Sequence, residues 1–459
     1  MTTPSRRPLR FHRLTPLLAA TLLWPAALRA QERRDPRVVS LVSKVEAARL
    51  HATVARLVGF GTRHTLSETG SATRGIGAAR TFLASEFAGL SKLPNSRLKP
   101  FEDRFTAVPG RRIPAPAELV NLGVVLPGTD PARARQALVM TGHYDSMPSD
   151  VMDPKADAPG ANDDGSGTSM VLELARAFAA ESPAISIYFV AVCGEEQGLV
   201  GSQHLAEALK KDGIEVLAMA SVDIAGNSEG MDGVRDSTSG RLFSESVSTI
   251  ENEAQKKARE ALGTDNDGPA REWARYLARV GERYVDGLHL RVMLRRDRIA
   301  RGSDHMSFAK AGFPALRLSE SRENYRRQHQ TPRVENGVQF GDDLEHFDAP
   351  YAARLCKALG AALAALSAAP AAPEKVLLGG AVSPDAKLRW TLPADPRIAD
   401  VHLYRRRAET VTWERVTSLG KVTEVALPSV VPDDWFFAVA TADAAGNESL
   451  PQAPGEVGR

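Results

Sequence analysis

The sequence predicts an α/β domain with a mixed, largely parallel sheet between helices, followed by a small all-β sandwich. Short strands that are apolar throughout alternate with helix-like segments, which is the pattern of a buried parallel sheet. After residue 373 this alternation gives way to short, evenly spaced strand-like runs. The 459 residues are 43% hydrophobic and 25% charged, an ordinary globular composition that excludes a disordered or fibrous protein.

Residues 1–30 predict a signal peptide. Arginines between Arg6 and Arg13 precede a short apolar stretch, residues 14–28, and Ala30 offers a small residue for cleavage. A membrane span is the alternative, but it needs about 20 apolar residues, more than this stretch provides. We therefore expect an exported protein, periplasmic or extracellular, with no stable membrane span.

The charge balance gives no reason to expect a nucleic-acid partner. Residues 1–30 hold five of the 58 basic residues and none of the 56 acidic ones, so the remaining chain has no basic excess. The two cysteines, Cys193 and Cys356, are too few for a disulfide framework, and the sequence does not decide whether they form a bond with each other.

The predicted α/β domain spans residues 31–366. It opens with helices over 38–58 and 74–88, and a Pro- and Gly-rich region over 95–135 follows. The alternation then comprises these segments: strand 137–140, helix 166–180, strand 185–192, helix 202–211, strand 216–222 and, later, strand 313–318. The polar residues 228–300 predict an excursion from the sheet, and residues 351–366 predict a closing helix.

The C-terminal part is predicted to be a separate module. Residues 367–374 form a Pro/Ala linker, and residues 375–459 contain strand-like runs near 387–390, 400–405 and 435–440.

Acidic residues and a histidine follow successive predicted strands at the point where each strand ends. Because open α/β sheets bind ligands outside the carboxyl ends of their strands, these side chains should meet at one edge. Each segment alone is compatible with a turn, a helix cap or a solvated pair, but together they predict a functional site. The residues are His143, Asp145, Asp163, Asp164, Glu195, Glu196 and Asp223.

Carboxylate and imidazole ligands without thiolates suit a catalytic zinc ion better than a structural one. Two zinc ions, roughly 3.5–4 Å apart, would need a bridging carboxylate and would lower the pKa of a bound water. A free carboxylate must then take a proton from that water and pass it to the leaving amine. Adjacent glutamates could divide this work, one as a ligand and one as the base.

Five stretches together resemble the M28 family of zinc peptidases, of the bacterial leucyl-aminopeptidase type. They are TGHYDS, PGANDDGSG, VAVCGEEQGLVGS, ASVDIAG and RGSDHMSFAKAGFPAL, in the family's order. The stretches lie within residues 137–332, and the resemblance extends over 38–366. It implies a phosphorylase/hydrolase-like fold, two zinc ions, and hydrolysis of the peptide bond that follows a free N-terminal residue.

The resemblance also implies the metal ligands. Asp163 would bridge the two zinc ions. His143 and Asp223 would complete one metal site, and Glu196 with His329 would complete the other.

Two further carboxylates receive roles from the same resemblance. Glu195 would be the general base and acid, and Asp145 would hydrogen-bond His143 and fix its tautomer.

His329 is the least direct of these assignments. The chain has Gln-His-Gln-Thr where the family typically shows Tyr-His-Thr, so His346 is the fallback ligand. His305, in Ser-Asp-His, fits the start of a helix or a supporting contact better than a ligand position.

The C-terminal module resembles a fibronectin type III domain. The carrying segments are Leu-Arg-Trp at 388–390, residues 401–406, residues 435–440 and the ending at 442–449. Trp390 and Tyr404 fit its core.

Three other functions remain open at the level of sequence. A carboxypeptidase of the same family would use the same ligands, and a glutaminyl cyclase would share the fold but hold one zinc. A metal-free binding protein is the third alternative, although no metal or base position is missing. Metal content separates a peptidase from the last two.

Overall fold

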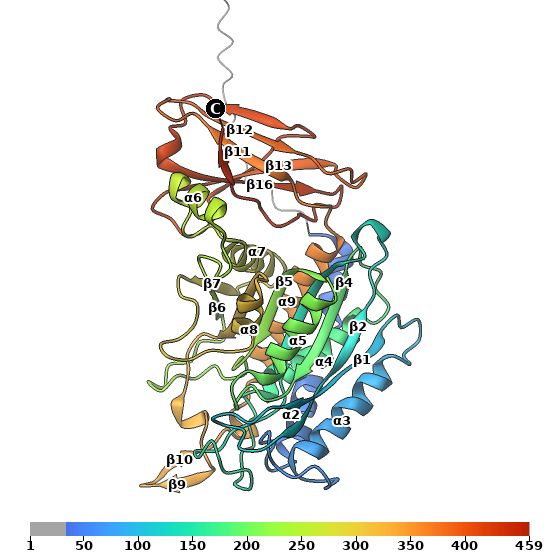
Figure 1. Ribbon diagram of the computed structural model, residues 1–459. Helices are drawn as coiled ribbons and strands as arrows, with labels where there is room; N and C mark the ends of the chain where they lie inside the picture. The colour runs from blue at the N-terminus through green and yellow to red at the C-terminus, as the bar shows by residue number, and fades with distance from the viewer. Residues whose placement is uncertain (1–33, 459) are drawn as a thin grey trace, which may run out of the picture. The chain divides into compact units, whose positions relative to one another are not determined.

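One mixed sheet of eight strands, in the order β1-β2-β4-β3-β5-β8-β6-β7, forms the centre of the α/β part (Figure 1). The computed structural model describes residues 34–458, so the predicted signal peptide lies outside the described residues. The strands are β1 (Lys99–Ala107), β2 (Ala117–Leu126), β3 (Gln136–His143), β4 (Ser186–Val192), β5 (Glu215–Val222), β6 (Ser239–Ser244), β7 (His289–Met293) and β8 (Ala315–Glu320). The central strands β4, β3, β5 and β8 are parallel, whereas β2 and β6 pair antiparallel on either side of them. This arrangement confirms the predicted fold class.

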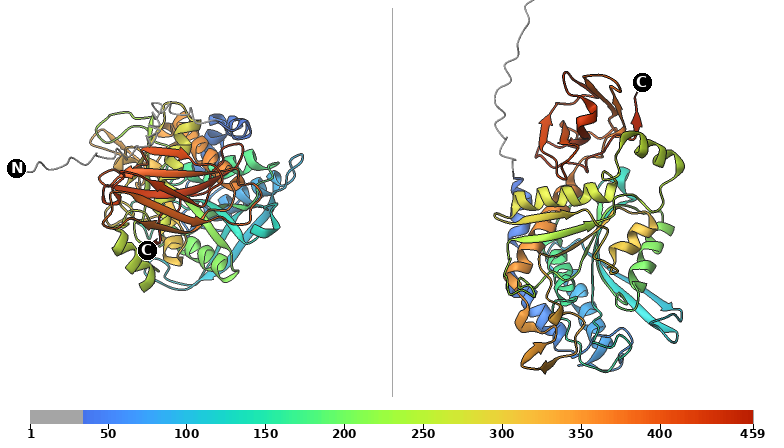
Figure 2. Two further views of the ribbon diagram at one scale, coloured as in Figure 1. Left: turned by 90° about the horizontal axis from the view of Figure 1, so that it is seen from above. Right: turned by 90° about the vertical axis from the view of Figure 1, so that its left-hand side faces the viewer.

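Helices cover both faces of this sheet (Figure 2). Successive strand residues alternate between the faces, so Leu138 and Met140 join the larger core while Val139 joins the smaller one. The larger core contains residues of α1 (Pro36–Ser43), α2 (Ala47–Val58), α3 (Gly75–Leu90), α4 (Gly165–Phe178), α7 (Pro269–Tyr284) and α9 (Ala349–Ala368). The smaller core contains residues of α5 (Val200–Lys211) and α8 (His305–Ala311).

The helix predicted over 38–58 is two helices, because α1 ends before Lys44 and α2 begins at Ala47. The buried Glu173 of α4 accepts hydrogen bonds from the Glu46 backbone N–H at 2.8 Å and from the Arg49 guanidinium at 2.7 Å. A tertiary contact thus satisfies the N-terminus of α2, and the periodicity of apolar residues does not reveal it.

The predicted excursion over 228–300 is wrong in part. β6 and β7 lie within it and extend the sheet, with β6 antiparallel to β8. These short strands include polar or charged residues such as Arg241 in β6 and the exposed Arg291 in β7, so they lack the continuous apolar run of the central strands. The remainder contains α6 (Glu253–Leu262) and α7.

The C-terminal residues form two small sheets, as predicted for an all-β sandwich. One sheet has the order β15-β12-β11-β17 and the other β14-β13-β16. Their strands are β11 (Glu374–Gly379), β12 (Ala386–Thr391), β13 (Asp400–Arg407), β14 (Arg415–Ser418), β15 (Glu424–Leu427), β16 (Trp435–Ala442) and β17 (Glu456–Val457). A core that includes Trp390, Leu403 and Phe437 fills the space between them. Since α9 runs to Ala368, only residues 369–373 connect it to β11.

Buried polar and charged contacts join this β module to α7 and to Asp267, which precedes α7. Arg406 of β13 contacts Asp267 at 2.6 Å, and the Trp413 indole N–H donates to Glu272 at 2.9 Å. Both carboxylates are almost fully buried. The linker is therefore not the only connection between the two parts.

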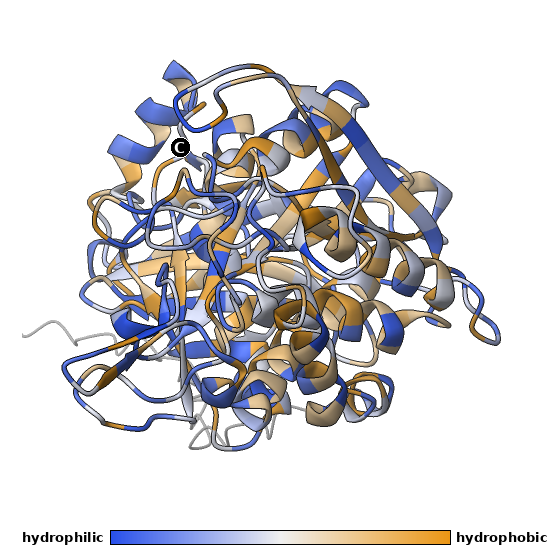
Figure 3. Cartoon of the chain, turned by 90° about the horizontal axis from the view of Figure 1, so that it is seen from below, coloured by the Kyte–Doolittle hydropathy of each residue, from blue (hydrophilic) through white to orange (hydrophobic). Residues whose placement is uncertain are grey.

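Hydrophobic residues, orange in Figure 3, run along strands and helices, while the loops alternate between hydrophilic and hydrophobic residues. Cys193 and Cys356 are both buried and unbonded. Within residues 34–458, every helix is too short or too polar to span a lipid bilayer.

Candidate metal centre

The predicted site residues converge at the carboxyl ends of β3, β4 and β5. His143 is the last residue of β3, Asp223 follows β5, and Glu195 with Glu196 follows β4. Asp163 lies in the loop that leads into α4. The structure therefore places these residues near strand ends, as the sequence predicts.

Glycines allow α4 to begin directly against the strand ends. A Cβ on Gly142 would lie 2.4 Å from the Gly167 carbonyl carbon, and one on Gly167 would lie 2.1 Å from the Val222 oxygen. Asp164 caps α4 by accepting the Gly167 N–H, and it also accepts the His143 backbone N–H at 3.0 Å. This close packing brings the loop with Asp163 up to His143.

The five predicted ligands form two clusters that share Asp163. One consists of His143, Asp163 and Asp223, and the other of Asp163, Glu196 and His329. Within each cluster the candidate ligand atoms all lie within 4.8 Å of one another.

The two carboxylate oxygens of Asp163 face different imidazoles. Oδ1 lies 3.2 Å from His143 Nε2, and Oδ2 lies 3.0 Å from His329 Nε2. His143 Nε2 is also 4.0 Å from Asp223 Oδ1, and His329 Nε2 is 3.3 Å from Glu196 Oε1. This is the arrangement that a carboxylate bridging two cations would need.

His329 reaches the cluster from a segment far away in the sequence, as the resemblance implies. Its backbone has a φ of 50°, a left-handed conformation that few non-glycine residues adopt. The fallback His346 belongs to none of the clusters found in the described residues. His305 begins α8, and its Nε2 contacts the Arg296 carbonyl at 3.0 Å, in keeping with a supporting position.

Asp145 contacts His143 differently from the prediction. The backbone carbonyl of Asp145 lies 3.1 Å from His143 Nδ1, whereas its carboxylate oxygen is 3.6 Å away. The carboxylate instead accepts backbone N–H groups of Gly194 at 2.9 Å and Glu196 at 3.1 Å, and the Thr65 hydroxyl at 2.9 Å. Asp145 thus orients the imidazole through its main chain and the two-glutamate turn through its side chain.

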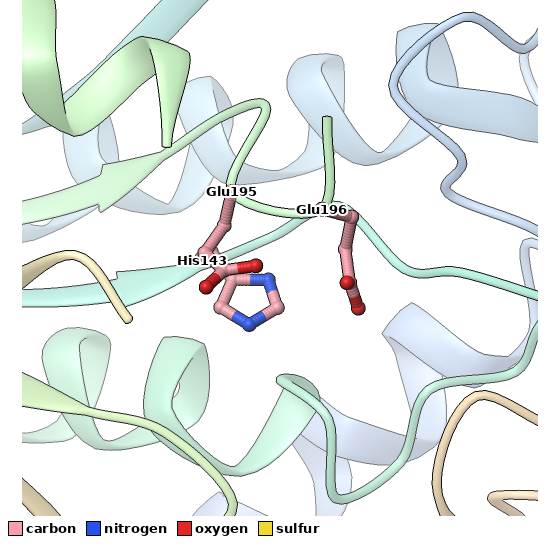
Figure 4. Close-up of side chains that lie close together, drawn as sticks. All are labelled: His143, Glu195 and Glu196. Carbon is pink, nitrogen blue, oxygen red and sulfur yellow. The ribbon is translucent and has the colours of Figure 1, made fainter. Parts of the chain in front are cut away.

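Glu195 belongs to a third group, with His143 and Glu196, whose candidate ligand atoms also lie within 4.8 Å of one another. Its carboxylate is adjacent to the His143 imidazole, and Glu196 extends from the same turn (Figure 4). Burial, together with the negative charge of Glu196 and Asp223, raises the pKa of Glu195 well above its usual value. A carboxyl group whose pKa is raised in this way is suited to take up a proton and release it again.

Burial and neighbouring charges shift the pKa values of Asp163 and Asp223. Burial opposes ionisation of Asp163, but hydrogen bonds from His143 and His329 outweigh it and hold its pKa well below the usual value. Burial and the Asp163 charge raise the pKa of Asp223. Concentrating carboxylates in this way is unfavourable unless cations neutralise them.

Three supporting residues escape the sequence-based prediction. Asp342 accepts the backbone N–H groups of Asn162 at 2.8 Å and Asp163 at 2.6 Å. Arg63, fully buried, donates to the carbonyls of Tyr144 and Gly160, each at 2.8 Å. No local pattern points to either of them.

Arg317 is the third supporting residue, and its guanidinium contacts Asp223 Oδ1 at 3.1 Å. The sequence does contain a signal for Arg317, because an arginine within an apolar strand such as β8 is expected to be buried and a buried charge needs a partner.

The donor set fits zinc. It contains imidazole nitrogens and carboxylate oxygens and no thiolate, as in catalytic zinc sites. Glu196 Oε1 and Asp223 Oδ1 are buried and form no hydrogen bond within the described part of the chain. Their contacts there are ionic, with His329 Nε2 at 3.3 Å and the Arg317 guanidinium at 3.1 Å. Cations between these groups would satisfy both oxygens.

Comparisons with known proteins relate the chain to zinc peptidases. The sequence profile described as peptidase family M28 matches residues 121–333. A protein of Leptosphaeria maculans named a probable zinc metalloprotease is 38% identical over 406 residues, which cover 88% of this chain and 94% of the relative. One of Pyrenophora teres f. teres with the same description is 38% identical over 419 residues, covering 90% and 86%.

Among solved structures, LapA of Legionella pneumophila has the same fold. The TM-score is 0.51 with 20% sequence identity, over 72% of this chain and 76% of that one.

Proposed function

This chain belongs to peptidase family M28 and is a zinc-dependent peptidase, and we propose that it is a two-zinc aminopeptidase with Glu195 as its general base. The observation that carries the proposal is the position of Asp163, whose two carboxylate oxygens face His143 and His329 at 3.2 and 3.0 Å. A single-zinc enzyme has no need for a second ligand set that shares this carboxylate.

Each residue has a distinct task in the proposed reaction. When bound, zinc lowers the pKa of water and polarises a carbonyl group. Glu195 takes one proton from the attacking water and delivers it to the nitrogen of the leaving amine. Arg317 holds Asp223, and Asp342 holds the loop with Asp163, so the ligands keep their positions.

The surplus of carboxylates supports recognition of a free N-terminus. Besides the ligands, Glu195 and the buried Asp304 contribute acidic groups to the cluster's surroundings. Burial is the largest cause that raises the pKa of Asp304 to about 7, and the charges of Asp145 and Asp223 add to it. A substrate ammonium group is complementary to such surroundings. The resemblance to leucyl-aminopeptidases supports the same proposal.

Carboxypeptidase activity is the second candidate, and Arg112 is the observation that favours it. Its guanidinium donates to the Glu196 carbonyl at 2.5 Å, so a cation stands next to the ligand segment. A guanidinium at this position could pair with the C-terminal carboxylate of a peptide.

Matched peptides distinguish these functions. Zinc-loaded and chelator-treated protein would receive one peptide in three forms: unmodified, N-acetylated and C-amidated. Mass spectrometry should show zinc-dependent loss of single residues from the N-terminus, abolished by acetylation and not by amidation. Loss from the C-terminus, abolished by amidation, would replace the proposal with the carboxypeptidase. Pyroglutamate formed from an N-terminal glutamine would indicate a cyclase, and no turnover of any peptide would indicate a binding protein.

We also propose that residues 1–30 direct export and that the C-terminal β module is of the fibronectin type III kind. Mass measurement of protein recovered from the periplasm or medium of an expressing bacterium should give a chain beginning at Gln31. Retention of the full-length chain in the cytosol would contradict export.

A further inference from the structure

Three arginines surround Trp435 at one end of the C-terminal module. The guanidinium carbons of Arg405, Arg407 and Arg415 lie 5.7, 5.0 and 5.6 Å from the centre of the indole ring. Arg405 and Arg407 belong to β13, Arg415 to β14 and Trp435 to β16. Three strands of one sheet thus bring three positive charges to one aromatic side chain.

Two of these charges have no anionic partner within residues 34–458. Neither Arg405 nor Arg415 forms an ion pair or a side-chain hydrogen bond there, and Arg405 Nε is buried without an acceptor. Arg405 is only 7% exposed. Arg407 differs, because Glu409 and Asp434 lie 3.5 and 4.0 Å from it.

The strand register makes this arrangement unfavourable for the protein alone. Arg405 lies directly opposite Arg415 in the antiparallel pair of β13 and β14. Like charges at facing positions repel each other, and the buried Nε of Arg405 loses its hydration without gaining an acceptor. Stacking on Trp435 attracts both cations but leaves their N–H donors without acceptors.

A cavity adjoins the cluster. It has a volume of about 360 Å³ and lies between the end of α6 and the module, with Trp435 and Phe437 in its wall. Leu378 and Pro432 add apolar lining. Asp433 also lines the cavity and none of the three arginines does, so the cavity meets the cluster only at Trp435.

We propose that Arg405 and Arg415, with Trp435 beside them, form an oxyanion-binding site of the C-terminal module. Its ligand group is a carboxylate, sulfate or phosphate, whose oxygens accept hydrogen bonds from both guanidinium forks and neutralise the facing charges. The group comes either from a free oxyanion or from an acidic peptide segment. This site is separate from the metal centre and independent of the proposed peptidase specificity.

Calorimetric titration of the zinc-loaded full chain tests the site. The two probes are sodium sulfate and an N-acetylated, C-amidated tetra-aspartate peptide, which lacks both free termini. At least one probe should bind with one equivalent per chain, and Arg415→Gln should weaken that binding at least tenfold. Arg415 is exposed, so this variant should fold. Arg389→Gln is the matched control, because Arg389 is an exposed arginine of the same module that pairs with Glu424 at 3.4 Å. It should bind like the unchanged protein.

The source of the oxyanion follows from the same titration. Sulfate binding identifies a free ion, and binding of the peptide without sulfate identifies an acidic segment. Failure of both probes, or equal binding by R415Q, would overturn the proposal.

Thermal stability provides a second readout. Without added anion and at low ionic strength, R415Q should unfold at the same temperature as the unchanged protein or higher, because one of two facing charges is gone. A lower midpoint for R415Q would mean that Arg415 serves the stacked cluster itself, which contradicts a site awaiting an anion.

Discussion

At the scale of single residues, the carboxylates divide into the ligands and the base that we propose and the residues that support them. Asp163 faces two imidazoles, Glu195 stands beside one of them, and Asp342 and Asp145 contact backbone N–H groups of the loops that carry these residues. Residues that bind N–H groups orient the loops, whereas the proposed ligands would meet the cations directly. Substitutions in the two groups should therefore differ in their effect on metal content and turnover.

Replacing Glu195 with Gln removes the proton acceptor while keeping the side-chain size. We expect zinc content to stay unchanged and kcat/KM to fall at least ~100-fold, the lower end of what general acid–base catalysis contributes. Metal analysis and initial rates on an N-terminally free peptide measure both quantities. Glu207→Gln, at an exposed glutamate of α5, is the control and should keep full activity. Near-normal turnover in E195Q would exclude Glu195 as the base.

Replacing Asp163 with Asn removes the charge shared by the two clusters. Because both ligand sets include this residue, the variant should bind fewer zinc ions per chain than the unchanged protein. Equilibrium dialysis followed by atomic absorption measures the stoichiometry. Asp157→Asn, which alters a surface pair with Arg74, should leave it unchanged. Full occupancy in D163N would refute the bridging role.

At the scale of elements, the ends of helices depend on contacts that lie far away in the sequence. α2 begins where it does because Glu173 of α4 accepts the Glu46 backbone N–H and the Arg49 guanidinium. The sheet likewise gains β6 from a region whose polarity argued against a buried strand, and β6 is stabilised by antiparallel pairing with β8. Local periodicity indicates that an element exists, but tertiary hydrogen bonds decide where it starts.

Glu173→Gln tests the contact between α4 and α2. The neutral amide cannot accept from the backbone N–H and the guanidinium as strongly, so we expect a loss of about 1–3 kcal/mol of unfolding free energy. Urea denaturation of the zinc-loaded protein measures this loss. Glu181→Gln, which alters a more exposed pair with Lys44, should cost less than about 1 kcal/mol. Equal effects of the two variants would contradict the role of Glu173.

At the scale of the whole molecule, the β module and α7 are held together by buried ionic groups. Glu448 contacts Arg279 of α7 and His402 of β13, and the Tyr276 hydroxyl donates to its backbone carbonyl at 3.0 Å. The Tyr404 hydroxyl donates to the same carboxylate at 2.7 Å. The attachment of the module should consequently depend on pH.

The sign of this dependence follows from two shifted pKa values. Burial lowers the pKa of His402, but the hydrogen bond to Glu448 and the charges of Glu448 and Asp400 outweigh burial and raise it. Its contribution to stability is complete below about pH 6.5 and is lost as pH rises through the folded-state value. Burial raises the pKa of Glu448, but Arg279 and His402 outweigh burial and lower it. The contribution of Glu448 to stability is therefore complete above about pH 4.5 and is lost as pH falls through its folded-state pKa.

His402→Gln isolates the upper limb of this dependence. The unfolding free energy of the unchanged protein should exceed that of H402Q most at pH 6, and the difference should shrink at pH 9. Urea denaturation of both zinc-loaded proteins at these two values gives the comparison, and the metal centre, common to both, cancels. A difference that does not vary with pH would rule out ionised His402 as part of the contact.

The sequence by itself determined the α/β class, the all-β C-terminal part and the strand ends that carry His143, Glu196 and Asp223. It could do so because buried parallel strands need continuous apolar runs, and the ends of such strands lie at one edge of the sheet. Motif order added His329, whose distance along the chain hides its place beside Asp163.

Only the tertiary structure decided which groups support the site. Asp342, Arg63 and the carboxylate of Asp145 act on backbone N–H and carbonyl groups of distant loops, and such partners leave no pattern in the sequence. The same holds for the break before α2 and for Arg405 facing Arg415, because strand register and helix starts depend on which segments meet in the folded chain.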